Sequence, residues 1–136
     1  MAFEIHERER EGIVILDVAG RLIVGLNSGV LRERINQALA AGKRNLVLNL
    51  KGVDYIDSTG LGTMVLCFNS VQKAGGALKL LRLNRRELEL LVLTKLTTIF
   101  DIYNDEVDAL NSFFPDREIK KFDILSFIKQ TQEEGM

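Results

Sequence analysis

The sequence predicts a small α/β domain in which a mixed β-sheet is packed with about four helices, followed by a short C-terminal extension. Two observations predict this class. Strand and helix patterns alternate in the order β-β-α-β-α-β-α-β-α, which is typical of parallel strands joined by helical crossovers after a first hairpin. The only proline, Pro115, then separates residues 1–114, the domain, from residues 115–136, the extension.

The first two elements form a predicted hairpin. Residues 3–9 alternate weakly between apolar and charged, which indicates an edge strand. Glu11 and Gly12 provide the turn. Residues 13–18 are largely β-branched, which favours a strand. We expect Gly20 to end this strand and a loop to follow it.

The middle of the chain predicts a helix, a strand and a second helix. Asn27 or Ser28 is a good N-cap for the first helix, and Gly42 is its C-terminal stop. Residues 45–50 have the apolar pattern of a central strand. The second helix carries an apolar stripe and ends at the glycine pair 75–76.

Four further elements complete the predicted domain. They are a strand over 77–83, a leucine-rich helix over 85–95, a short strand over 97–103 and a last helix capped by Asn104 or Asp105. The leucine-rich helix has more apolar residues than one stripe needs, which favours burial on two sides or a surface facing a partner.

The extension is too apolar for a plain solvated tail. Asp123 is placed to cap a short helix whose apolar face would carry Ile124, Leu125, Phe127 and Ile128. We expect this segment to dock either on its own domain or on a partner, and the sequence favours neither.

Composition excludes several classes of function. The 136 residues carry 18 basic and 19 acidic side chains, so the chain lacks the basic excess of proteins that bind nucleic acid or anionic membranes. One cysteine and one histidine exclude a disulfide framework and a multi-cysteine zinc site. We predict no metal, no cofactor, no direct nucleic-acid partner and no membrane insertion. The start has no signal-peptide pattern, so we expect a cytoplasmic protein.

One motif stands out between the central strand and the second helix. It consists of Asp57, Ser58, Thr59, Gly60, Leu61 and Gly62. Two hydroxyls here occupy the first turn of a helix, where free N–H groups tolerate a phosphate. The two glycines are expected to leave the turn open to an approaching partner. The simpler interpretation is a helix cap, because Asp, Ser and Thr are the best capping residues.

The surroundings of this motif resemble the STAS domain of bacterial anti-sigma factor antagonists. In that family a strand such as residues 46–50 leads into an Asp-Ser-Ser/Thr-Gly-Leu-Gly motif, here residues 57–62. A Gly-Gly turn and another strand follow, here residues 75–80, and the closing helix and strand resemble residues 94–100. The resemblance covers roughly residues 3–113 and implies a STAS-like single domain.

The resemblance also implies a protein switch without catalytic residues of its own. In the family, the serine after the motif's aspartate is phosphorylated by a partner that is both an anti-sigma factor and a serine kinase. The matching residue here is Ser58, with Thr59 as the fallback acceptor. The unphosphorylated form binds the anti-sigma factor and frees the sigma factor to direct transcription, and a phosphatase resets the switch. Residues 57–62 would contribute the partner-binding surface, with Asp57 as a local cap.

A second predicted contact loop departs from the family pattern. The family usually has Gly-Glu-Leu-Asp after its second strand, where this chain has Gly20, Arg21, Leu22 and Ile23. Arg21 and Ile23 replace two acidic residues of a loop that contacts the partner, and a reversed charge changes partner choice. The alternative function is therefore a STAS scaffold subunit of a stressosome-like or membrane transport complex, in which Ser58 is never phosphorylated. The oligomeric state is left open.

An enzyme is the third possibility, and the residues disfavour it. His6, the only histidine, is expected at the surface of the first strand, and no Gly-x-Ser-x-Gly elbow surrounds Ser58. Cys67 lies among apolar residues of the second helix and is expected to be a buried structural thiol.

Overall fold

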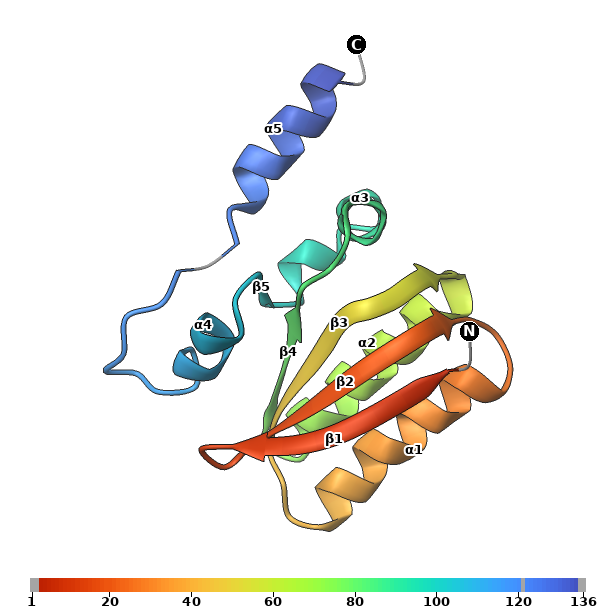
Figure 1. The fold of residues 1–136 in the computed structure, drawn as a ribbon, viewed down its shortest axis with the longest axis vertical. Coiled ribbons are helices and arrows are strands. Elements are labelled where there is room, and N and C mark those ends of the chain that lie inside the picture. The colour runs from red at the N-terminus through yellow and green to blue at the C-terminus, as the bar shows by residue number, and fades with distance from the viewer. Residues whose placement is uncertain (1–2, 121, 135–136) are drawn as a thin grey trace.

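The computed structural model describes residues 3–120 and 122–134, and its strands form one sheet in the order β1-β2-β3-β4-β5 (Figure 1). β1 pairs with β2 in antiparallel fashion, and every other pair of neighbours is parallel. The strands are β1 (Glu4–Arg10), β2 (Ile13–Leu22), β3 (Asn45–Ile56), β4 (Ala77–Leu81) and β5 (Ile102–Tyr103). The predicted mixed α/β sheet is therefore confirmed.

Helices pack on both faces of this sheet. They are α1 (Leu26–Ala40), α2 (Ser58–Lys73), α3 (Arg85–Leu93), α4 (Glu106–Asn111) and α5 (Ile124–Glu134), with a 3-10 turn at Leu96–Thr98. α1 and α2 lie side by side against one face, and α4 covers part of the other (Figure 1). α3 follows the carboxyl end of β4. One stripe of this helix is buried, with Leu88 and Leu91 in it, whereas Leu93 is exposed.

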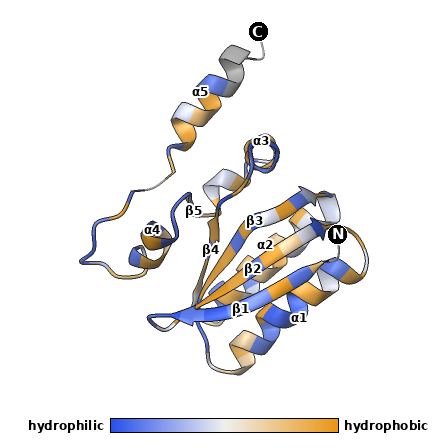
Figure 2. Cartoon of the chain, in the orientation of Figure 1, coloured by the Kyte–Doolittle hydropathy of each residue, from blue (hydrophilic) through white to orange (hydrophobic). Residues whose placement is uncertain are grey.

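Alternation along the strands divides the interior into two cores. Val14 and Leu16 of β2 point into the larger core, under α1 and α2, whereas Ile13 and Ile15 point into the smaller core with Tyr103. This period of two is the property of a pleated strand. Figure 2 shows apolar colour along β2, β3 and β4 and polar colour along β1, as expected for an edge strand that must not pair with other chains.

Two strands are longer than predicted. The strand expected to end at Gly20 continues to Leu22, and the strand expected over 45–50 continues to Ile56. The two extensions pair with each other, with Arg21 opposite Tyr55 and register shifts on the way. Pairing therefore overrides the local preference of glycine and charged residues for a loop.

The start of the first helix also differs from the prediction. α1 begins at Leu26 after Gly25, and neither Asn27 nor Ser28 caps it. The Ser28 hydroxyl instead donates a hydrogen bond to the Ile23 carbonyl (2.7 Å), and the Asn27 amide donates to the Arg21 carbonyl (2.8 Å). These side chains hold the end of β2 in place rather than starting the helix.

The strand predicted over 97–103 is mostly absent. Only Ile102 and Tyr103 form a strand, because β4 offers partners to those two residues alone, and a 3-10 turn occupies the start of the range. β4 itself ends at Leu81, since Arg82 takes a left-handed conformation with φ of 58°.

The C-terminal extension contacts the domain at several points. The Arg117 guanidinium pairs with Glu11 (2.9 Å) and lies over the Phe114 ring. The Phe122 amide donates a hydrogen bond to the Ile102 carbonyl (3.4 Å) on β5, and Phe122 and Phe127 pack against the larger core.

The helix of the extension begins where the sequence predicts it. The Asp123 carboxylate accepts a hydrogen bond from the Ser126 amide (3.0 Å), and α5 follows, pointing away from the sheet (Figure 1). Leu125 on this helix is 76% exposed. Among the described residues, no helix combines the length and the apolar character that a bilayer crossing requires.

Candidate functional site

The motif at residues 57–62 lies where β3 ends and α2 begins. Asp57 is the N-cap of α2, and its Oδ1 accepts a hydrogen bond from the Gly60 amide (2.8 Å). Its Oδ2 accepts a second bond from the Val24 amide (3.0 Å), and its own amide donates to the Leu22 carbonyl (3.2 Å). Asp57 therefore caps the helix and also fastens it to the segment after β2.

The electrostatics of Asp57 follow from these bonds. The amide of Gly60, and after it the amide of Val24, lowers the pKa of the Asp57 carboxyl below its usual range. Two backbone donors thus stabilise the ionised carboxylate, so it stays charged at neutral pH while its oxygens are already engaged.

The two candidate phosphate acceptors are both exposed at the start of α2. Ser58 is the first residue of the helix, and among the described residues its hydroxyl has no hydrogen-bond partner. Thr59 is exposed too, and its carbonyl accepts a bond from the Thr63 hydroxyl (3.0 Å). The capping role thus belongs to Asp57, and Ser58 is left free for another use.

The glycines of the motif do not share one role. A Cβ on Gly60 would overlap the Leu22 carbonyl oxygen, so Gly60 lets α2 approach β2 closely. Gly62 is exposed, and a Cβ there would meet nothing within 4 Å. Leu61 is buried in the larger core. The expectation that both glycines open the turn is therefore wrong for Gly60, and Gly60 and Leu61 serve packing within the domain.

The structure brings the second predicted contact loop to the same place. Arg21 is exposed at the end of β2, and Ile23 is half-buried just beyond it. Because Leu22 and Val24 both bond to Asp57, this loop and the start of α2 form one rigid surface at the carboxyl edge of the sheet.

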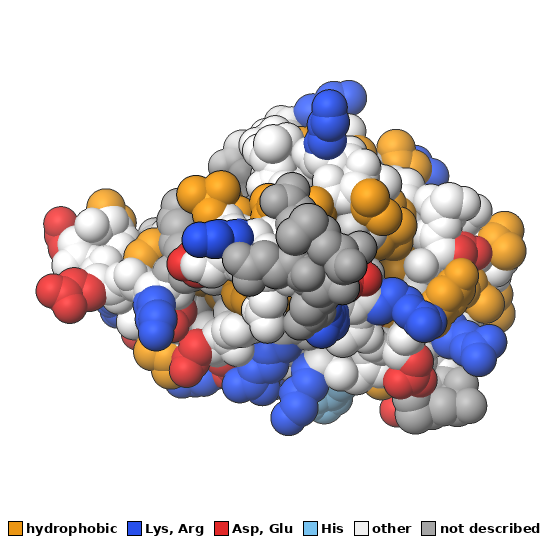
Figure 3. Space-filling model, turned by 90° about the horizontal axis from the view of Figure 1, so that it is seen from above, with side chains coloured by type: hydrophobic (Ala, Val, Ile, Leu, Met, Phe, Trp, Pro, Cys, Tyr) orange, Lys and Arg blue, Asp and Glu red, His pale blue; other side chains and the backbone are white. Residues whose placement is uncertain are grey.

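Several exposed apolar side chains at this edge were missed from the sequence. Val24 is 66% exposed, Leu26 is 81% exposed and Tyr55 is 40% exposed. Seen from above, hydrophobic and basic side chains, with a few acidic ones, are interspersed on the right (Figure 3). The sequence did contain a signal for two of them. Val24 and Leu26 flank a glycine in a predicted loop, and a loop exposed to solvent does not need large apolar residues.

Other chemistry is not assembled in the described part of the chain. His6 is exposed on β1. Burial raises the pKa of the Cys67 thiol to about 11, so it is a structural thiol. No group of three metal-ligating side chains lies together among the described residues. A groove of about 680 Å³ lies between α3, α4 and the extension rather than at the motif, with Leu83, Phe122 and Phe127 in its lining.

Comparison with known proteins agrees with this geometry. The family model described as STAS domain matches residues 4–109. The anti-sigma-B factor antagonist of Bacillus subtilis is 38% identical over 102 residues, which cover 75% of this chain and 92% of that protein. The anti-sigma F factor antagonist of Paenibacillus polymyxa is 28% identical over 111 residues, which cover 81% and 94%.

Solved structures of similar proteins share the fold. An anti-sigma factor antagonist from Mycobacterium paratuberculosis superposes with a TM-score of 0.70 at 20% identity, covering 82% of this chain and 93% of that chain. The phosphorylated form of the Bacillus cell fate determinant SpoIIAA superposes with a TM-score of 0.63 at 18% identity, covering 82% and 99%. At these identities the likeness concerns the fold alone.

Proposed function

This chain belongs to the STAS domain family, and from that premise we propose that it is an anti-sigma factor antagonist whose partner binding is switched by phosphorylation of Ser58. Unphosphorylated, it binds an anti-sigma factor that is also a serine kinase and so releases a sigma factor. Phosphorylation of Ser58 breaks that complex, and a phosphatase restores it. Anti-sigma factor antagonists are regulators rather than enzymes, which agrees with the prediction of a non-enzymatic protein.

The observation that carries the proposal is the state of the Ser58 hydroxyl. It is exposed, it has no partner among the described residues, and it stands at the start of a helix whose cap is another residue. A free hydroxyl in this position can accept a phosphoryl group without losing a structural bond. The exposed apolar side chains of Val24 and Leu26 on the adjoining loop give a partner something to cover.

The charge added by phosphorylation should act on the partner more than on the fold. A phosphoserine carries roughly −1.5 to −2 charges at neutral pH. The start of α2 offsets part of that charge, by about 0.3–1 kcal/mol. A partner that covers Ser58 would have to bury the phosphate, and an unpaired buried charge costs several kcal/mol. The complex should therefore dissociate while the domain stays folded.

The first test is phosphorylation of the purified chain by its cognate anti-sigma factor kinase, supplied with ATP and magnesium, followed by mapping of the modified residue. We expect phosphate on Ser58, none on Ser58→Ala, and normal phosphorylation of the matched control Thr59→Ala. Phosphate on Thr59 alone, or retained in Ser58→Ala, would contradict the assignment.

The second test is affinity, measured by titration calorimetry against the same anti-sigma factor. Ser58→Asp should bind at least about tenfold more weakly than the wild type, which corresponds to about 1.4 kcal/mol. Its unfolding free energy should change by less than about 1 kcal/mol, as for a charge at a helix start. Ser58→Ala should keep both affinity and stability, since Ser58 caps nothing. Equal affinity of Ser58→Asp and wild type would exclude an electrostatic switch.

One observation favours the scaffold alternative, namely the cation Arg21 on the contact loop where the family usually has an acidic residue. In that case the chain would join a stressosome-like or transport assembly without being phosphorylated. Capture of other STAS subunits, with no kinase and no phosphate on Ser58, would favour this alternative over the switch.

A further inference from the structure

Arg21 is an exposed cation without an internal partner. Among the described residues it has no hydrogen bond or ion pair from its guanidinium group. Two arginines near the same strands are engaged, whereas Arg32 on α1 is exposed and, like Arg21, has no hydrogen-bond or ion-pair partner among the described residues. Arg8 pairs with Asp17 (2.6 Å), and Arg34 lies near Glu7 (3.6 Å). A guanidinium held at the surface with all its donors free is available for a carboxylate of another molecule.

The position of Arg21 relative to Ser58 is fixed by the backbone. The next residue, Leu22, accepts the hydrogen bond from the Asp57 amide, and its carbonyl lies against Gly60. On the neighbouring strand Tyr55 stands opposite Arg21 in the register. The backbones of Arg21 and Ser58 are therefore linked at the carboxyl edge of the sheet, where one partner can contact both residues.

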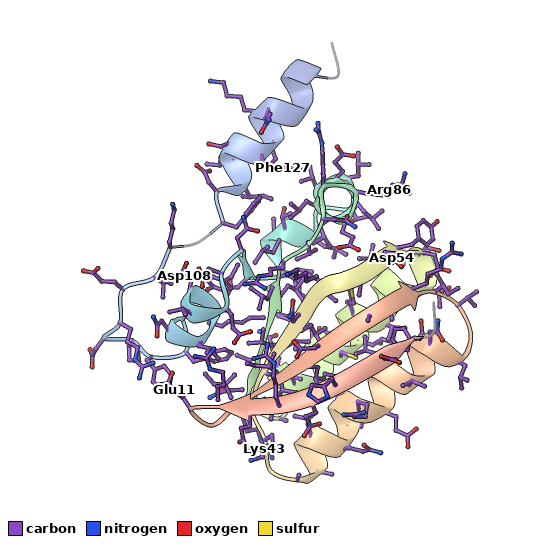
Figure 4. All side chains as sticks on the ribbon, in the orientation of Figure 1. Glu11, Lys43, Asp54, Arg86, Asp108 and Phe127 are labelled. Atoms are coloured by element: carbon purple, nitrogen blue, oxygen red, sulfur yellow. The ribbon has the colours of Figure 1, made fainter. Side chains whose placement is uncertain are left out.

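The carboxylates of this edge do not neutralise Arg21. Asp57 is engaged by the amides of Gly60 and Val24. Asp54 lies at the end of β3, below α3 in Figure 4, and its charge acts on Glu87 of that helix. Beside Arg21 the loop presents apolar side chains instead, with Val24 66% exposed. Arg21 is thus an unpaired cation beside an apolar surface.

We propose that the anti-sigma factor bound at Ser58 presents an acidic side chain to Arg21, next to an apolar surface that covers Val24 and Leu26. This inference rests on the function proposed above and adds the sign of the partner's charge. Complementary charges fix orientation and exclude partners that carry a cation at this place. A phosphate on Ser58 would repel the same acidic side chain, so the charge that selects the partner also makes the switch effective.

The test is the dissociation constant of the purified cognate anti-sigma factor for three forms of the full chain, measured at 50 and 200 mM NaCl. We expect Arg21→Glu to bind at least tenfold more weakly than the wild type and to lose much of the salt dependence. The control is Lys73→Glu, which makes the same change of net charge at the far end of α2, about 20 Å from Ser58. It should bind within twofold of the wild type. Circular dichroism confirms that each form is folded.

A charge reversal on the partner completes the experiment. Changing the acidic residue of the anti-sigma factor that faces Arg21 to lysine should restore binding to Arg21→Glu and weaken binding to the wild type. Equal or tighter binding of Arg21→Glu, or an equal loss in Lys73→Glu, would overturn the acidic-partner inference while leaving the Ser58 switch intact. If the wild type itself neither binds the anti-sigma factor nor is phosphorylated by it, the proposed function is wrong and this inference falls with it.

Discussion

Gly60 and Gly62 lie two positions apart on α2 and face different surroundings. A methyl group on Gly60 would overlap the Leu22 carbonyl oxygen, which is backbone and cannot move aside, whereas Gly62 faces open space. We expect Gly60→Ala to lower the free energy of unfolding by about 3 kcal/mol, the upper part of the range for overpacking. Gly62→Ala should raise it by about 0.5–1 kcal/mol, because alanine is the better helix former.

Urea unfolding of the two variants measures both changes. The pair is well matched, since the substitution and the helix are the same and only the distance to β2 differs. A Gly60→Ala protein as stable as the wild type would contradict the close approach of α2 to β2.

Glu87 is a buried carboxyl with only one of its oxygens engaged. Oε1 accepts a hydrogen bond from the Asn84 amide (3.0 Å) in the capping box of α3, whereas Oε2 has no hydrogen-bond partner in the part of the chain that the structure describes. Burial, assisted by the charge of Asp54, raises the pKa of Glu87 to about 7. The folded protein then holds a proton that the unfolded chain releases near pH 4.5, so stability falls as pH rises from about 4.5 to about 7.

Glu87→Gln should remove this penalty, because glutamine also completes a capping box and carries no charge. A rise in pKa of this size corresponds to about 3 kcal/mol, so the variant should be more stable than the wild type at pH 8 by up to that amount. Urea unfolding between pH 4 and pH 8 checks the slope. The control Glu89→Gln lies on the same helix and pairs with Arg85 at the surface, and it should keep the wild-type slope. A wild-type protein with no fall in stability over this range would contradict a buried, protonated Glu87.

At the scale of elements, α4 is held to the sheet by the packing of Ala109 and Leu110 and also by a carboxylate. Glu106 of α4 accepts hydrogen bonds from Arg8 and Arg10 of β1, and Arg8 also binds Asp17 of β2. The Arg8 guanidinium, and then Arg10, lowers the pKa of Glu106 to about 2. The stability that this carboxylate contributes is therefore present above about pH 4.5 and is lost as pH falls toward 2.

Glu106→Gln should cost about 1 kcal/mol at pH 7, since the network is partly open to solvent and screened. At pH 2 the variant and the wild type should have equal stability. The control Glu9→Gln removes a surface ion pair with Lys43 (2.8 Å) and should cost less than about 0.5 kcal/mol. Thermal or urea unfolding of the two variants at pH 7 and pH 2 measures these costs. If Glu106→Gln lowered the stability equally at both pH values, Glu106 would act through packing rather than charge.

The same elements show which parts of the fold can be predicted from the sequence. The order of strands and helices was predictable because each carries its own period of two or 3.6, and Asp123 and Asp57 were predictable as caps because capping is local. The extension of β2 to Leu22 and of β3 to Ile56 was not, because it depends on pairing between strands far apart in the chain.

The candidate site likewise has features that the local sequence predicts and features that depend on tertiary contacts. Ser58 was predicted from its motif alone and is exposed in the structure, whereas the bond from the Val24 amide to Asp57 is a contact between distant segments. The exposure of Val24, and the packing role of Gly60, depend on the same tertiary contact. Local signals thus locate the motif, whereas the surface around it appears only when β2 and β3 are paired.

At the scale of the whole molecule, the candidate site and the C-terminal extension occupy different parts of the sheet. Ser58 and Arg21 lie where the neighbouring strands β2 and β3 end, whereas the extension contacts β5, at the edge of the sheet. The family model ends at residue 109, so the extension adds to the domain rather than belonging to its shared part. Its contacts favour a stabilising role that is separate from partner binding.

Removal of residues 115–136 tests that separation. The truncated chain loses the packing of Phe122 and Phe127 on the larger core and the hydrogen bond to the Ile102 carbonyl. Two half-buried phenylalanines contribute about 2–3 kcal/mol together, so we expect residues 1–114 to fold with stability lowered by that amount. The affinity for the anti-sigma factor should stay within twofold, because no contact at Ser58 is removed.

Leu125→Ser in the full chain is the control, and since Leu125 is 76% exposed it should cost less than about 0.5 kcal/mol. Urea unfolding, together with amide hydrogen exchange at Ile102 and its neighbours, measures the loss. A truncated chain as stable as the full one would show that the extension does not dock on the domain, and a truncated chain that cannot fold would place the domain boundary beyond residue 114.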